Sequence, residues 1–181
     1  MRTVMRVALD KLYLWCGYLA AIFLAGIGVL MLAQVAGREL GLQVRGADDL
    51  TAWFCAASAF LPLAHTFKQG ELVRVGLLIE NLPESRRYWA ELLSLSVASL
   101  ATAYMTWAAF IFVVQSYEFD EKAQGLLQIP IWIPQCSFVL GALMLAIACL
   151  DELITLLRGG KPTYRLAHEE RMRRGEFGEG V

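Results

Sequence analysis

The apolar run over residues 12–36 contains no charged side chain and is long enough to cross a bilayer as a helix. Three more long apolar blocks follow it. The chain of 181 residues is 57% hydrophobic and only 18% charged, with a mean hydropathy of +0.51. A soluble domain of this size would not gather its apolar residues into such blocks. The sequence therefore predicts an all-α integral membrane protein with four transmembrane helices.

The four spans are predicted over residues 12–36, 50–67, 89–115 and 134–157, within a single membrane domain of residues 1–158. The first block follows a short basic head, as the core of a secretory signal peptide would. It is about twice as long as the apolar core of such a peptide and no clear cleavage site follows, so an uncleaved span is expected. The charged tail over residues 159–181 is expected to be cytoplasmic, as a solvated helix or a disordered segment.

A shorter apolar stretch, residues 72–82, lies between the second and third spans. At about 1.5 Å per residue it would reach roughly 16 Å, half of the hydrocarbon core, so it cannot cross the membrane. We therefore predict a short amphipathic helix at the inner membrane interface. The residues expected on its apolar face are Leu72, Val75, Leu78, Ile79 and Leu82.

Basic residues are unequally distributed between the two sides of this four-span arrangement. Thirteen of the sixteen fall in the head, in the loop after the second span and in the tail, and the other side keeps only Arg38, Arg45 and Lys122. By the positive-inside rule both termini are then cytoplasmic. Tryptophan placement agrees with this topology. Trp15 and Trp89 fall near the predicted inner interface, and Trp53 and Trp132 near the outer one.

The centres of the four predicted spans carry no charged residue. A charge at the bilayer centre costs roughly 3 kcal/mol on insertion scales, so ion and proton pathways are marked by acids or bases inside spans. A self-sufficient ion-coupled transporter, or a stand-alone small exporter, would be expected to hold an essential acid there. We therefore expect that this chain does not move a substrate by itself.

Cysteine and histidine placement predicts no cofactor and no metal site. A four-span membrane enzyme that passes electrons from thiols to quinone needs paired cysteines in its outer loops. The cysteines here are single in sequence and lie within or at the edges of spans: Cys16, Cys55, Cys136 and Cys149. His65 and His168 are the only histidines, and a haem held by two histidines needs both within the membrane. The thiol and quinone redox enzyme stays open as an alternative of a different class, beside the small exporter.

Two helix faces lined with small residues are candidates for packing against a larger membrane subunit. In each face the residues repeat at every fourth position, which places them on one side of a helix and lets a second helix approach closely. The first face consists of Gly17, Ala21 and Ala25, and the second of Ser94, Ala98 and Thr102.

The order of motifs along the chain resembles that of one transporter family. An acidic pair precedes a short span that ends in Ala64 and His65, and a Leu-Val-Arg-Val-Gly-Leu-Leu stretch and a Leu-Pro pair follow before two arginines. This layout is similar to the small membrane subunit (DctQ-type) of tripartite ATP-independent periplasmic (TRAP) transporters, over nearly the whole chain. The sequence departs from the family pattern at Glu71 and Leu72, where His-Ile is usual, and at Gly76, where Asp is usual.

The resemblance implies an accessory, non-enzymatic role in the bacterial inner membrane. In the family a large permease subunit carries the sodium and substrate sites, and a periplasmic binding protein captures the substrate, commonly an organic acid. The small subunit supports the large one. The implied partners are the large permease subunit, the binding protein and membrane lipids, with no nucleic acid.

The two outer loops, residues 37–49 and 116–129, would then form part of the surface on which the binding protein docks. Their charges are net acidic, and complementary charge raises the rate of encounter more than the affinity, which suits a transient partner. Asp49 is expected instead to cap the start of the second span. The candidate docking residues are Arg38, Asp48, Glu118, Asp120 and Glu121.

Overall fold

The computed structural model describes residues 2–42, 45–69, 84–125, 127–160 and 162–164. Its helices are α1 (Arg2–Glu39), α2 (Ala47–Phe60), α3 (Leu63–Gln69), α5 (Glu84–Glu118) and α6 (Trp132–Leu157). These residues contain no strand, and their only β-type pairing is an isolated bridge between Lys122 and Pro130. The prediction of an all-helical chain is confirmed for this part of the protein.

Within the described residues, four helical stretches are long and apolar enough to cross a membrane. They are Leu9–Glu39, Ala47–Gln69, Arg86–Glu118 and Trp132–Leu157. The expectation of four membrane-spanning segments is thus confirmed by length and composition. The predicted interfacial helix over residues 72–82 lies outside the described residues, as does most of the predicted tail.

The second span consists of two helices, because regular helix is interrupted at Leu61 and Pro62, between α2 and α3. Pro62 has no backbone N–H, so the helical hydrogen bond to the carbonyl of Ser58 cannot form. Helical bonding resumes when the N–H of Thr66 donates to the carbonyl of Pro62 at 2.9 Å. The Thr66 hydroxyl also donates to the carbonyl of Leu63, at 3.0 Å.

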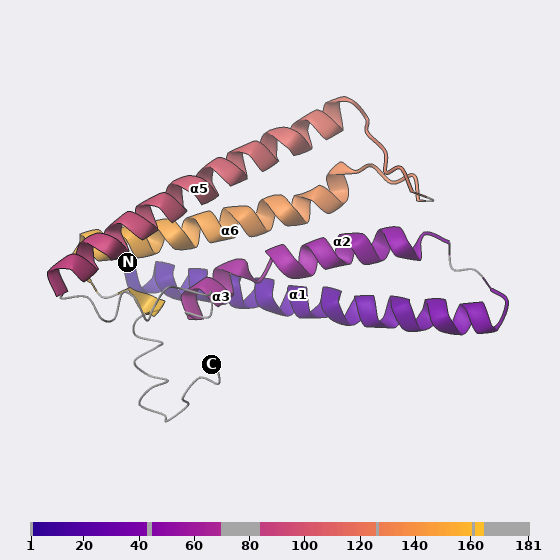
Figure 1. The fold of residues 1–181 in the computed structure, drawn as a ribbon, viewed down its shortest axis with the longest axis horizontal. Helices are drawn as coiled ribbons and strands as arrows, with labels where there is room; N and C mark the ends of the chain where they lie inside the picture. Colours follow the sequence, from indigo (N-terminus) through magenta and orange to yellow (C-terminus); the bar gives the residue numbers. More distant parts are fainter. Residues whose placement is uncertain (1, 43–44, 70–83, 126, 161, 165–181) are drawn as a thin grey trace, which may run out of the picture.

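The middle of the molecule is formed by α6 and by the α2–α3 segment (Figure 1). Helix α1 packs on α2 and α3, and α5 packs on the other side of α6. Burial follows this order: α6 is the most buried of the spans, whereas α1 and α5 are mostly exposed. The spans therefore form an open arrangement in which the two outer helices expose most of their surface.

Figure 1 shows two helix pairs, α1 with α2 and α5 with α6, that converge at one end and diverge toward the other. We call the converging end, which holds Asp10, Lys68 and Asp151, the junction end. The opposite end, with the connections around residues 40–46 and 119–131, is the loop end. The α5–α6 connection leans across the loop end toward the start of α2 (Figure 1).

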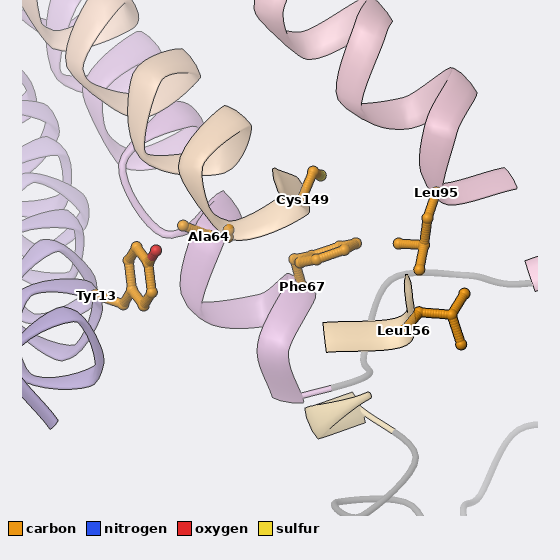
Figure 2. Packing of buried hydrophobic residues seen from close by; sticks show 7 residues of the cluster. Tyr13, Ala64, Phe67, Leu95, Cys149 and Leu156 are labelled. Carbon is orange, nitrogen blue, oxygen red and sulfur yellow. The ribbon is translucent and has the colours of Figure 1, made fainter. Parts of the chain in front are cut away.

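The main hydrophobic cluster lies at the junction end, where side chains from α1, α3, α5 and α6 meet (Figure 2). Its buried residues are Tyr13, Ala64, Phe67, Leu95, Ala148, Cys149 and Leu156. Farther along, the helix pairs touch through a close contact between α6 and α2. A Cβ atom on Gly141 would overlap the backbone carbonyl of Phe60, and the rings of Phe60 and Phe138 meet edge to face with centroids 4.4 Å apart. A glycine at residue 141 is what allows this approach.

Candidate functional site

Lys68, in the last turn of α3, is the centre of an ion-pair network at the junction end. Its Nζ lies 2.8 Å from Asp10 Oδ1 of α1 and 3.6 Å from Asp151 Oδ2 of α6. The same atom lies 5.0 Å from the centre of the Tyr13 ring, within cation–π range. The Lys68 side chain is only 10% exposed, and a buried ammonium group requires compensating charge. Because both acids come from other helices, the network ties α1, α3 and α6 together.

A second acid, Glu152, holds the segment that follows α6. Glu152 is fully buried, and its Oε2 accepts a hydrogen bond of 2.8 Å from the backbone N–H of Thr163. Gly159 turns the chain with φ 74°, a left-handed conformation that glycine adopts without strain. The ring of Tyr164 then lies 6.4 Å from that of Phe67. The chain after α6 therefore returns against α3.

Helix α5 reaches the junction end with an internal ion pair. Arg87 Nε donates to Glu91 Oε1 at 3.2 Å, one helical turn apart, and the Glu91 side chain is buried. The pairing lets an acid lie at the start of this span without exposing a bare charge to an apolar environment. Lys68 and Arg87 are thus each paired with acids at the junction end, and these ion pairs stabilise the helix arrangement.

The sequence interpretation did not single out Asp10, Lys68, Asp151 or Glu152 as functional residues. Each lies at the end of a predicted span, where charges are common. The signal that could have identified them is that Lys68 and acids near the ends of the first and fourth spans are predicted on the same side of the membrane. Opposite charges that meet at one edge of the hydrocarbon core are expected to pair.

All five candidate docking residues lie at the loop end and all five are exposed: Arg38, Asp48, Glu118, Asp120 and Glu121. Three of the acids also have partners nearby. Asp48 Oδ1 accepts a bond of 2.8 Å from Gln34, Glu121 Oε2 accepts one of 3.0 Å from the Ser116 hydroxyl, and Asp120 Oδ2 lies 3.9 Å from Lys122 Nζ. The structure therefore brings these residues to one end of the molecule with their charges accessible to solvent.

Asp49 joins the two loops rather than capping α2 through its side chain. The N-cap residue of α2 is Gly46, which makes no side-chain cap. Asp49 Oδ2 instead accepts a hydrogen bond of 3.3 Å from the backbone N–H of Leu127, in the connection between α5 and α6. A Cβ atom on Gly125 would overlap the Asp49 carboxylate, so the loop passes very close to the start of α2. The expectation of a simple cap is corrected: Asp49 links the two loops.

The two small-residue faces each lie partly inside the molecule and partly on its surface. A Cβ atom on Gly17 would lie 3.9 Å from the His65 ring of α3. On α5, Ala98 packs against the main cluster, and the Thr102 hydroxyl donates to the Ala98 carbonyl at 2.8 Å. The members that are exposed are Ala21, Ala25 and Ser94.

The described part of the chain contains neither a disulfide nor a group of side chains arranged as a metal site. No disulfide joins the four cysteines, of which Cys149 lies in the main cluster and Cys55 is exposed. Among all the residues that the structure describes, no group of three His, Cys, Asp or Glu side chains is arranged to hold a metal ion.

The chain matches a known protein family over most of its length. Residues 27–159 match the family described as tripartite ATP-independent periplasmic transporters, DctQ component. The matched region contains α2, α3, α5 and α6, with Lys68, Asp151 and the whole loop end. No individual curated protein gives a significant sequence match. The members of this family are transporter components rather than enzymes. They function together with a large permease and a periplasmic binding protein. More than half of the chain matches this family, and the chain belongs to it as the small membrane subunit of a TRAP transporter.

Proposed function

We propose that this chain supports a large permease subunit during sodium-coupled uptake of an organic acid, which a periplasmic binding protein delivers. The observation that carries the proposal is the placement of charge. The sequence has no acid or base at the centre of a span, and the buried Lys68 pairs with the half-buried Asp151 at the junction end. A coupling ion needs acidic or carbonyl ligands at membrane depth, so a partner must supply them.

Reconstitution in liposomes tests this accessory role. The isolated chain should give no sodium-driven uptake of an organic acid, whereas the same chain together with its permease and binding protein should give uptake. Liposomes that contain the permease and binding protein without this chain provide the matched control, and they should show reduced uptake. Robust uptake by the isolated chain would refute the accessory role.

We further propose that both termini lie in the cytoplasm and that the membrane is the bacterial inner membrane. The support is the excess of Lys and Arg in the head, in the loop after the second span and in the tail. Accessibility labelling of a single cysteine should then report opposite sides for Asp120→Cys and for a position in the tail. Labelling of both positions from the same side would contradict the four-span topology.

The loop end is our candidate docking surface for the binding protein. Two observations support it: the five candidate residues are exposed together, and the Asp49 bond to Leu127 makes one surface of the two loops. In the proposed topology this surface faces the periplasm. An exposed, net acidic surface can raise the rate of encounter with a complementary partner and still release it after delivery.

A further inference from the structure

Tyr104 and Trp107 lie halfway along α5, far from either end of its span. The nearest charged residues on the helix are Glu91 and Glu118, thirteen and fourteen residues away from Tyr104. At about 1.5 Å per residue each of them is roughly 20 Å distant, so Tyr104 lies near the middle of a hydrocarbon core about 30 Å thick. Trp107 is less than one turn further along the helix. Both rings are therefore at a depth that water does not reach.

The other tryptophans occupy the positions that membranes favour for this side chain. Trp and Tyr concentrate at membrane interfaces, where the ring meets lipid and the polar atom meets water. The remaining four are near span ends: Trp15, Trp53 and Trp89 lie within four residues of a charged residue, and Trp132 is the first residue of α6. Trp107 is the exception, and nothing in the sequence interpretation marked it.

The two side chains point away from the rest of the subunit. Tyr104 is 67% exposed and Trp107 is 60% exposed, and their ring centroids are 6.0 Å apart. The Tyr104 hydroxyl and the Trp107 indole N–H have no hydrogen-bond partner among the described residues. The neighbouring hydroxyls of Thr102 and Thr106 differ, because each donates to a carbonyl of its own helix at 2.8 Å. Lipid tails offer no acceptor, so a lipid cover would leave the two aromatic donors unsatisfied.

The residues around this pair form a regular stripe on the outer face of α5. They recur at alternating spacings of four and three residues, the pattern with which a second helix can pack along the first at a small crossing angle. All of them are large and exposed: Leu93, Val97, Leu100, Tyr104 and Trp107. We call these five residues the α5 stripe.

We propose that the α5 stripe packs against a transmembrane helix of the large permease subunit, and that this helix presents a hydrogen-bond acceptor opposite Tyr104 and Trp107. A hydroxyl, a carboxamide or an unpaired backbone carbonyl at mid-membrane depth would accept from both donors. The proposal rests on the accessory role, which supplies the permease as the membrane partner. It adds the surface of this subunit that makes the contact and the chemistry at its centre.

Site-specific photo-crosslinking in the assembled complex tests the surface. A benzophenone side chain at Leu100, in the α5 stripe, should give an adduct with the permease. One at the exposed Leu19, which lies on the side of α1 away from Gly17, Ala21 and Ala25, should not. An adduct between two copies of this chain would overturn the proposal in favour of a homodimer. Absence of any protein adduct at Leu100, in complexes from which the permease still co-purifies, would assign the stripe to lipid and leave the accessory role standing. Failure of the permease to co-purify with the unaltered chain would instead refute the accessory role itself.

A double variant tests the chemistry. Tyr104→Phe with Trp107→Phe removes both polar atoms and keeps aromatic rings on the stripe. The amount of permease that co-purifies should fall several-fold, because interhelical hydrogen bonds in membranes each contribute modestly. The matched control is Trp15→Phe with Tyr18→Phe, an exposed aromatic pair near the start of α1, which should leave co-purification unchanged. Both variants should melt like the unaltered subunit when isolated. Unchanged co-purification of the stripe variant would overturn the proposed hydrogen bonds.

Discussion

The junction end and the loop end use charged residues in opposite ways. At the junction end the buried Lys68 pairs with acids from two other helices. The buried Glu152 accepts a hydrogen bond from the backbone N–H of Thr163, in the segment after α6. At the loop end Glu118 and Asp120 are exposed. Removal of one member of a buried pair strands its partner in a low-dielectric environment, whereas an exposed charge can change at little cost to the fold. The comparison teaches that the fold depends on the charges of one end, while those of the other remain available to a partner.

The largest effect is expected from Lys68→Met. Loss of the cation leaves Asp151, which is only 21% exposed, without its partner, whereas Asp10 is 56% exposed and stays hydrated. We expect the free energy of unfolding to fall by up to about 3 kcal/mol. Thermal denaturation of the purified subunit in detergent measures it. The matched control is Lys122→Met at the loop end, whose pair with Asp120 is exposed, and it should change stability by less than about 0.5 kcal/mol. Equal effects of the two variants would remove the distinction between the ends.

A smaller effect is expected midway between the ends, from Gly141→Ala. The added Cβ atom would overlap the carbonyl of Phe60 and force α6 away from α2, at a cost of about 1–3 kcal/mol in unfolding free energy. Gly28→Ala is the control, because a Cβ atom there meets nothing within 4 Å. It should leave stability unchanged or raise it by up to about 1 kcal/mol, since alanine favours helix more than glycine. If both variants melted alike, the close approach of the two helix pairs would be contradicted.

The smallest effect on the subunit itself is expected from reversal of Glu118, Asp120 and Glu121 to Lys. Each exposed charge contributes less than about 0.5 kcal/mol to stability, so the melting temperature should hardly move. Uptake by the complete transporter should nevertheless slow several-fold, and more so at low salt, where screening is weak. Arg158→Glu, an exposed charge reversal at the junction end, should not slow uptake. Unchanged uptake by the triple variant at every ionic strength would make these loops solvated connectors only.

The number of helical spans could be predicted because a bilayer leaves few choices: an apolar block of about 20 residues must satisfy its backbone internally, as a helix. The gathering of the docking candidates at one end followed from the order of the spans. The topology placed acids on the same side of the membrane as Lys68, but it could not predict which of them would pair with it. Asp10 is 58 residues away in sequence, and local periodicity says nothing about such pairs. The same holds for Asp49 and Leu127, 78 residues apart. Pro62 is plain in the sequence, but membrane helices often tolerate proline, so its effect on the second span was not evident.

The two outer helices have longer spans than the two that lie between them. The candidate spans of α1 and α5 have 31 and 33 residues, whereas that of α2 with α3 has 23 and that of α6 has 26. At about 1.5 Å per residue these correspond to roughly 47–50 Å and 35–39 Å. A helix longer than the hydrocarbon core responds to the mismatch by tilting or by locally thickening the bilayer. Figure 1 shows α1 and α5 diverging toward the loop end, so at least one of them must be tilted from the membrane normal. Thicker membranes should therefore draw the outer helices upright and close the angle between the pairs, and thinner ones should widen it.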